Sequence, residues 1–152
     1  MQEKPNIDIR RFVETFEKLA KAERRKQSLF GLKQSEARVL LCIEQLSYEN
    51  KQIVTVSEIS KKMLVTSPTV TELIKSLSNN GYIERSVDSQ DKRVSDIKLT
   101  AKGEKIVQKL INYFTSLFSG LIEKIGVEQS ETLLDLLDEV CLYLNETNLD
   151  SD

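Results

Sequence analysis

Residues 66–103 read TSPTVTELIKSLSNNGYIERSVDSQDKRVSDIKLTAKG and contain a helix start, a helix stop and two strand patterns in succession. The pair Ser67-Pro68 predicts a helix start, because a serine hydroxyl caps a helix and proline fits its first turn. The apolar residues that follow recur at spacings of three and four and predict one buried helix face: Val70, Leu73, Ile74 and Leu77. Gly81 ends this helix, since glycine adopts a positive φ at low cost.

A hairpin follows this helix. Residues 82–87 predict a strand, residues 88–93 a polar turn, and residues 94–99 alternate between apolar and polar side chains as a half-buried strand does. A short helix precedes the helix that starts at Ser67, and the turn at 64–66 joins the two. This arrangement is helix-turn-helix geometry. We interpret the longer helix as a recognition helix and the hairpin as a β-wing.

Helical spacing of apolar residues extends over most of the remaining chain. We expect a mainly α fold with a small β-sheet, in which Ser57 and Thr100 cap two of the helices and residues 53–55 form a short β-like run. The further helices are expected at about 8–29, 34–47, 58–63, 101–125 and 128–145. The apolar stripes of the first helix and the last two exceed what one small domain can cover.

The composition disfavours several classes of protein. The chain has no histidine, which removes the commonest general base and metal ligand, so we expect no enzyme activity, no metal and no cofactor. No run of 18 apolar residues occurs, so we expect no membrane span. The first ten residues, MQEKPNIDIR, lack the apolar segment of a secretory signal, which predicts a cytoplasmic protein.

The two cysteines, Cys42 and Cys141, lie far apart and lack metal-ligand spacing. We interpret them as reduced core residues, with a disulfide or a redox switch as the alternative. Because Cys42 has apolar neighbours in the sequence, we expect a raised thiol pKa and an inert thiol.

Charge is distributed unevenly along the chain, whose formal net charge is −2. Residues 1–30 carry 8 basic and 5 acidic side chains, residues 31–100 carry 10 and 9, and residues 101–152 carry 4 and 10. The acidity therefore lies in the last third, and the first two thirds can still present a basic face. Charge alone leaves DNA binding open.

The sequence resembles the MarR family of bacterial transcription regulators. The resemblance covers the recognition helix, the wing and the start of the next helix, in the motifs Ser67-x-x-Val70-Thr71-x-Leu73-Ile74-x-x-Leu77, Gly81-Tyr82-Ile83-Glu84-Arg85, Asp88-x-x-Asp91-Lys92-Arg93 and Leu99-Thr100-x-x-Gly103. The order of the expected helices also resembles that of the family over nearly the whole chain.

The resemblance implies a homodimer that binds double-stranded DNA at a palindromic operator, as a repressor or an activator, and of the two we expect a repressor. It implies a dimerisation helix in residues 1–30, a winged helix-turn-helix DNA-binding domain in 31–100 and dimerisation helices in 101–152. A simple monomer core is the alternative for the outer helices. Many members release DNA when they bind a small, often phenolic effector or when a cysteine is oxidised.

The sequence departs from the family pattern at three places. Glu72 stands where many relatives carry a basic residue, and a carboxylate there either repels phosphate or accepts a hydrogen bond from a cytosine amino group. Lys33 stands where a threonine or serine cap commonly opens the second helix. The end of the first helix lacks the reactive cysteine of redox-sensing relatives.

For the recognition helix we expect four residues to face the major groove, where hydroxyls suit base edges and lysine suits phosphate or guanine: Ser67, Thr69, Thr71 and Lys75. An ordinary solvated helix face is the alternative.

For the wing we expect Arg93 to enter the minor groove, held by Asp91 through a charge-assisted bond. Lys92 and Arg85 are expected on phosphate. A surface ion pair of small energetic value is the alternative.

The aromatic residues do not identify where an effector binds. A crevice between the dimerisation helices and the winged domain is the expected place for an effector. Aromatic residues at helical spacing more often belong to a core, although five of them could line the crevice: Phe16, Phe30, Tyr48, Tyr113 and Phe114. The second interpretation of the whole chain is a winged-helix module that binds another protein.

Overall fold

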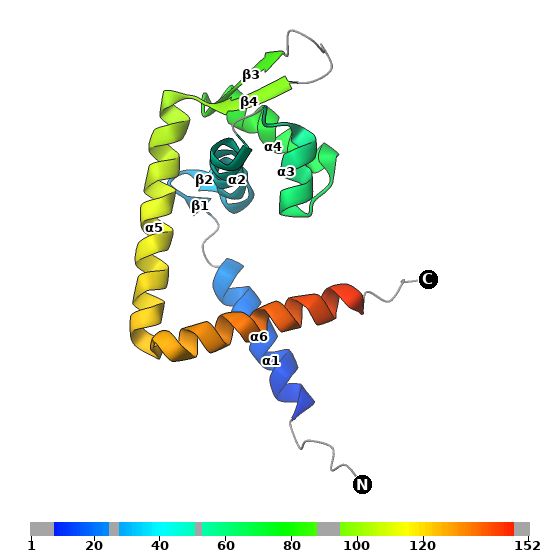
Figure 1. Ribbon diagram of the computed structural model, residues 1–152, viewed down its shortest axis with the longest axis vertical. Coiled ribbons are helices and arrows are strands. Elements are labelled where there is room, and N and C mark those ends of the chain that lie inside the picture. The colour runs from blue at the N-terminus through cyan, green and yellow to red at the C-terminus, as the bar shows by residue number, and fades with distance from the viewer. Residues whose placement is uncertain (1–7, 25–27, 51–52, 88–94, 148–152) are drawn as a thin grey trace. The chain divides into compact units, whose positions relative to one another are not determined.

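The computed structural model describes residues 8–24, 28–50, 53–87 and 95–147 (Figure 1). The elements follow in the order α1 (Ile9–Arg24), β1 (Ser28–Leu29), β2 (Leu32–Lys33), α2 (Gln34–Asn50), α3 (Val56–Met63), α4 (Ser67–Asn79), β3 (Ile83–Val87), β4 (Ser95–Leu99), α5 (Ala101–Ile125) and α6 (Val127–Glu146). The chain divides into two compact units, Met1–Leu110 and Ile111–Asp152, so α5 begins in the first and ends in the second. No helix in the described ranges has the length and apolar character needed to cross a bilayer.

The mainly α fold with a small sheet is confirmed, and the helix limits agree best near the C-terminus. The helix predicted over 101–125 is α5, and α6 extends the prediction of 128–145 by one residue at each end. The helix predicted over 34–47 continues to Asn50 in α2.

The prediction of a first helix reaching residue 29 is wrong, because α1 ends five residues earlier and β1 pairs antiparallel with β2. The turn between these strands needs positive φ at Phe30 (53°) and Gly31 (83°). The hairpin brings Leu29 and Leu32 opposite each other, and both are buried. Burial of this pair favours the hairpin over further helix.

The third helix starts earlier than predicted. Its cap is Thr55 and not Ser57: the Thr55 hydroxyl accepts from the Glu58 N–H at 3.3 Å, and the Glu58 carboxylate accepts from the Thr55 N–H at 3.1 Å. This reciprocal pair is a capping box. The helix ends at Met63, and the φ of 55° at the C-cap residue Leu64 turns the chain toward α4.

The wing consists of β3 and β4, which pair antiparallel. The β-like run predicted at 53–55 is not a strand, yet it is attached to β4 by hydrogen bonds. The Ile97 N–H donates to the Val54 carbonyl at 2.9 Å, and the Val54 N–H donates to Asp96 Oδ1 at 3.1 Å. These bonds attach the base of the wing to the chain between α2 and α3.

The core of the first unit lies where α2 packs against α3, α4 and β4. The side chains that are fully buried there and at the adjoining start of α5 are all aliphatic: Leu32, Val39, Leu40, Ile43, Val54, Ile59, Val70, Ile74, Leu77, Ile97 and Leu110. Burying one such side chain stabilises a fold by about 1.5–3 kcal/mol. This cluster therefore fixes α4 and the wing base on α2.

The start of α5 joins the end of α4 through one hydroxyl. Thr100 Oγ1 accepts from the Gly103 N–H at 3.1 Å, which confirms the predicted cap, and it donates to the Gly81 carbonyl at 2.6 Å. Gly103 is buried, and a Cβ added there would lie 2.0 Å from the Tyr82 carbonyl oxygen. Only a glycine allows this approach.

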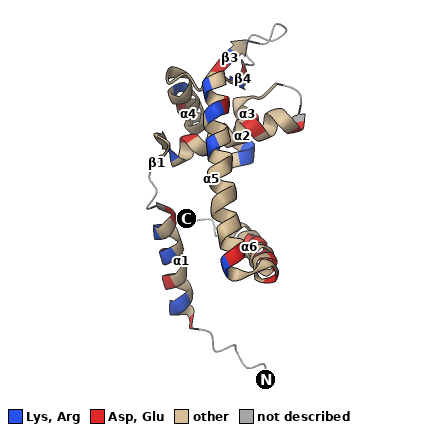
Figure 2. Cartoon of the chain, turned by 90° about the vertical axis from the view of Figure 1, so that its left-hand side faces the viewer, with Lys and Arg blue, Asp and Glu red and all other residues tan. Residues whose placement is uncertain are grey.

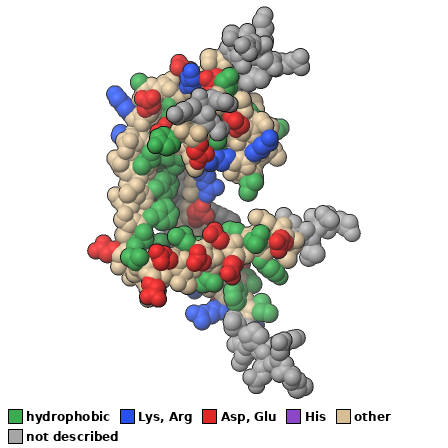
Figure 3. All heavy atoms as spheres, viewed as in Figure 1, with side chains coloured by type: hydrophobic (Ala, Val, Ile, Leu, Met, Phe, Trp, Pro, Cys, Tyr) green, Lys and Arg blue, Asp and Glu red, His purple; other side chains and the backbone are tan. Residues whose placement is uncertain are grey.

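Apolar side chains remain exposed on the outer helices (Figure 3). On α1 they are Ile9, Phe12, Val13, Phe16 and Leu19, with exposed fractions from 46% to 78%. On the part of α5 in the second unit and on α6 they are Ile111, Leu117, Phe118, Leu121, Ile122, Val127, Leu133, Leu134, Leu136, Leu137, Leu142, Tyr143 and Leu144. Scattered exposed apolar residues are ordinary, but stripes of this extent indicate an interaction surface.

The close approach at Gly103 gives a matched pair of substitutions within α5. Gly103→Ala should lower the free energy of unfolding by about 3 kcal/mol or more, because the Tyr82 backbone has to move. Gly120→Ala, whose Cβ would meet nothing within 4 Å, should raise it by up to about 1 kcal/mol. Chemical denaturation of both variants checks this, and equal stabilities would contradict the packing described at Gly103.

Candidate nucleic-acid interface

The orientation of α4 follows from its apolar stripe. Val70, Ile74 and Leu77 are each fully buried, so the opposite side of the helix faces solvent. Gly81 has a φ of 76° and ends the helix in a Schellman motif, with the N–H of Tyr82 bonded to the Leu77 carbonyl at 3.0 Å. The predicted stop at Gly81 is therefore confirmed.

The start of α4 differs from the prediction by one residue. Thr66 occupies the cap position, and Ser67 and Pro68 lie inside the first turn. The Thr66 side chain makes no capping bond and instead contacts the Thr69 hydroxyl at 2.9 Å. The backbone N–H groups at this end of α4 therefore lack a side-chain cap from Thr66.

A buried carboxylate holds one flank of α4. Glu36 is only 8% exposed, and its Oε1 accepts from the Ser76 hydroxyl at 2.9 Å. Its Oε2 accepts from the Lys33 N–H at 3.0 Å, which closes the start of α2 without a threonine or serine cap. Glu36 therefore connects the start of α2 to the middle of α4. Glu36 is not among the site residues predicted from the sequence, although a glutamate three residues after a helix boundary is half of a capping box.

A longer contact holds the other flank, where the Ser67 hydroxyl lies 3.5 Å from that of Ser60 on α3. Between these two contacts, four residues share the exposed side of α4 at spacings of four, seven and eleven: Pro68, Glu72, Lys75 and Asn79. We call them the outer stripe. It lies opposite the buried stripe and is the part of α4 that an external partner can reach.

The four predicted recognition residues are all exposed, but they differ in what their side chains do. Lys75 belongs to the outer stripe. The Thr71 hydroxyl donates to the Ser67 carbonyl at 2.9 Å, one turn back in the same helix. Thr71 and Ser67 therefore lie toward the α3 side, and Thr69 lies on the side toward α2.

The wing residues are placed only in part. Arg85 is exposed on β3, in the register position opposite Ile97. The other three predicted wing residues, Asp91, Lys92 and Arg93, lie outside the described residues.

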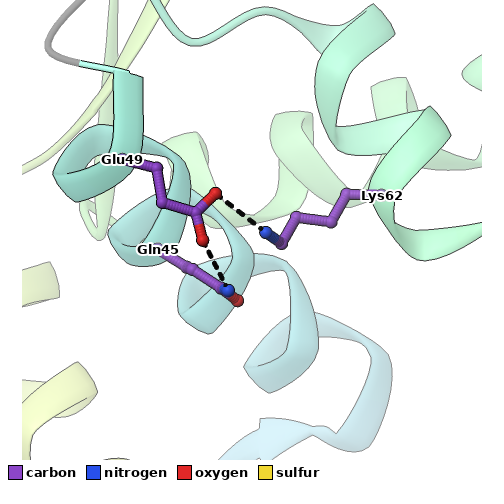
Figure 4. A network of polar contacts seen from close by, with 3 residues as sticks. All are labelled: Gln45, Glu49 and Lys62. Atoms are coloured by element: carbon purple, nitrogen blue, oxygen red, sulfur yellow. Dashed lines mark hydrogen bonds and ion pairs between the residues drawn. The ribbon is translucent and has the colours of Figure 1, made fainter.

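The α2–α3 pair is joined at its surface by a small polar network (Figure 4). Glu49 accepts from Gln45 at 2.8 Å and from Lys62 at 3.2 Å. The Gln45 hydrogen bond, followed by the Lys62 ammonium, lowers the pKa of the Glu49 carboxyl. The network ties the last turns of α2 to α3, which carries the helix-turn-helix turn at its end.

The cysteines behave differently from each other. Cys42 is buried on α2, and desolvation raises the pKa of its thiol, as expected for an inert residue. Cys141 is exposed on α6, so its interpretation as a core residue is wrong for the single chain.

A shallow pocket of about 330 Å³ opens beside the wing base. It is lined by the outer face of α2, by β4 and by the start of α5, and three carboxylates contribute to it: Glu44, Asp96 and Glu104. Lys98 also lines the pocket, and its ammonium lies 3.3 Å from Asp96 Oδ2, so one of the three carboxylates is already paired.

The five candidate aromatic residues do not line this pocket. Phe16, Phe30 and Tyr48 are exposed, so the core interpretation is wrong for these three in the single chain. Tyr113 and Phe114 are half-buried on α5, with their rings edge to face at 5.2 Å.

Helix α4, the turn before it and the β3–β4 hairpin after it define a winged helix-turn-helix domain. Residues 32–95 match the model of the MarR family. The HTH-type transcriptional regulator YsmB of Bacillus subtilis, whose description calls it uncharacterized, is 31% identical over 90 residues, which cover 57% of this chain and 62% of YsmB. The chain therefore spans less than two thirds of that relative's length.

Solved structures extend the likeness over most of the chain. Streptococcus pneumoniae FabT in complex with DNA has a TM-score of 0.73 at 25% identity, covering 91% of this chain and 99% of FabT. A Staphylococcus aureus MepR–DNA complex has a TM-score of 0.75 at 24% identity, covering 88% of this chain and 97% of MepR, and supports the fold alone. The match over residues 32–95 confirms the resemblance to the MarR family for that segment, and the solved structures show the same fold over most of the chain. The description of YsmB as a transcriptional regulator agrees with the expectation that the protein is not an enzyme.

The Glu36–Ser76 bond can be tested with two serines of α4. Ser76→Ala should lower the free energy of unfolding by about 1–3 kcal/mol, because it leaves a buried carboxylate oxygen without its donor. Ser78→Ala removes a hydroxyl without a bond among the described residues and should change stability by less than about 0.5 kcal/mol. Urea denaturation of both variants gives the comparison, and equal values would contradict a stabilising role for this bond.

Proposed function

We propose that the protein is a homodimeric transcription regulator of MarR type that binds a palindromic DNA operator and acts as a repressor. The observation that carries the proposal is the outer stripe of α4, a polar helix face held outward by a buried apolar stripe and directly followed by a wing. A helix presented in this way fits the major groove, and a hairpin beside it reaches the adjacent minor groove or backbone.

The charged residues of the domain support different roles for α4 and for the wing in DNA binding. The outer stripe carries one basic and one acidic residue, Lys75 and Glu72, so α4 supplies little net attraction to phosphate. Residues 82–99 also carry four basic and four acidic side chains, so the wing would attract phosphate through individual contacts of Arg85, Lys92 and Arg93 and not through a net charge. We infer that α4 selects the site and that the wing supplies much of the salt-dependent affinity.

The dimer is supported by the exposed apolar stripes on the outer helices. In this proposal residues 1–30 and 101–152 form the dimer interface and residues 31–100 bind DNA. A second copy of the chain supplies the missing cover for α1, α5 and α6. Two-fold symmetry then places the recognition helices about 34 Å apart, on successive major grooves of one DNA face.

The acidic surface of α6 fits a part of the protein that does not touch DNA. This helix carries Glu128, Glu131, Asp135, Asp138, Glu139 and Glu146 and no lysine or arginine, and Figure 2 shows its acidic positions in red on the ribbon. Negative charge there disfavours contact with phosphate. A regulator of this kind acts in the cytoplasm, where a small-molecule effector can control its release from DNA.

The DNA-binding proposal is tested by selecting bound duplexes from a random pool and measuring affinity for the selected site at several salt concentrations. We expect a palindromic site and an affinity that falls steeply with salt. Arg93→Ala should weaken operator binding by roughly tenfold or more without lowering the melting temperature.

Arg38→Ala is the matched control, because it removes the same charge from an exposed ion pair with Glu23 that joins α1 and α2. Wild-type protein that recovers no preferred duplex would contradict the DNA-binding proposal. Selective capture of another protein would then support the alternative binding module.

The dimer proposal is tested by sedimentation of Leu134→Lys, which places a charge in the exposed apolar surface of α6. We expect a shift from dimer to monomer at micromolar concentration, because a buried unpaired charge destabilises an interface. Thr132→Lys, exposed two residues earlier in the same helix, should remain dimeric. A wild-type monomer under these conditions would contradict the two-half-site arrangement.

A further inference from the structure

We propose that Glu72 is a specificity-determining residue that reads a cytosine in the major groove of each half-site. The proposal rests on the DNA-binding function proposed above. It adds the identity of one base and the side chain that selects it.

Glu72 lies at the centre of the exposed side of α4. It lies in the middle of the outer stripe, four residues after Pro68 and three before Lys75. The buried residues Val70 and Ile74 lie on the other side of the same turns. A base edge facing the centre of α4 therefore meets Glu72 before it meets the threonines nearer the flanks.

The Glu72 carboxylate is free to accept hydrogen bonds from an external donor. Within the described part of the chain, Glu72 forms no ion pair, although Lys75 lies at the spacing where such pairs form. Other glutamates of the domain are engaged: Glu36 holds Ser76, and Glu58 closes the cap of α3. Both oxygens of Glu72 therefore remain open to an external donor.

The chemistry of the major groove then narrows the choice of base. A carboxylate only accepts hydrogen bonds, so it needs a donor on the base edge. Guanine presents only acceptors there, and thymine presents an acceptor and a methyl group. Adenine places its amino donor beside the N7 acceptor, which repels a carboxylate and suits an amide instead. Cytosine presents the N4 amino donor, and this leaves it as the partner for Glu72.

A negative side chain on this stripe also repels DNA of any sequence. The repulsion is offset only where the carboxylate finds its donor. Glu72 therefore acts twice, by accepting from the correct base and by weakening binding to every other sequence.

The test is a parallel duplex selection with wild-type protein, Glu72→Gln and Glu72→Ala. We expect a cytosine at one position of each wild-type half-site. Glu72→Gln should prefer adenine there, because glutamine pairs with the adenine N6 and N7 atoms. Glu72→Ala should lose the preference at that position alone. Both variants should bind the wild-type operator roughly tenfold more weakly relative to unrelated duplex.

Glu44→Gln is the matched control, since it removes one exposed carboxylate from α2 of the same domain. It should recover the wild-type operator. A wild-type protein that selects no sequence contradicts the DNA-binding function itself. A wild-type operator recovered unchanged by both Glu72 variants contradicts only the role of Glu72.

Discussion

Burial of three aliphatic side chains on one side of α4 determines how this protein can meet a partner. Val70, Ile74 and Leu77 have no exposed surface, and turning the helix about its axis would return them to water. Exposing one such side chain costs about 1.5–3 kcal/mol, which is large beside a stability of 5–15 kcal/mol typical of a domain. The outer stripe is therefore as fixed as the core. The hydrogen bond from Ser76 to the buried Glu36 further fixes the rotation of α4 about its axis. A hydrogen bond has a preferred geometry, whereas apolar contact has little.

The sequence predicted those elements whose signals are local. Thr100 was recognised as a cap because it precedes a long apolar stripe, and α5 begins and ends where expected. Gly81 was recognised as a stop because few other residues adopt its φ of 76°. Such signals need only neighbouring residues, so they are readable without the fold.

The features that the sequence did not predict correctly are of two kinds. Some depend on contacts between residues distant in sequence, and others on a choice between neighbouring residues of similar type. The β1–β2 hairpin was missed because Leu29 and Leu32 also fit helical spacing. Glu36 was overlooked because its partner Ser76 lies forty residues away. The cap of α4 was misplaced by one residue because Thr66 and Ser67 are equally suitable types. The recognition residues were chosen by side-chain type alone, whereas the structure adds the position of each on the helix surface.

The hydrogen bonds of the Thr100 hydroxyl affect which parts of such a protein can change in sequence during evolution. It joins the exit of α4 to the entry of α5 and so fastens the base of the wing from both sides. The wing base is fastened again where Ile97 bonds to Val54. The hydrogen bonds of Thr100 and of Ile97 hold the base of the wing. Substitutions in the connection between Val87 and Ser95 therefore leave α4 in place. Under the proposed function, duplicated copies of the gene can acquire new wing sequences, and with them a different strength of DNA binding, without rebuilding the domain that carries them.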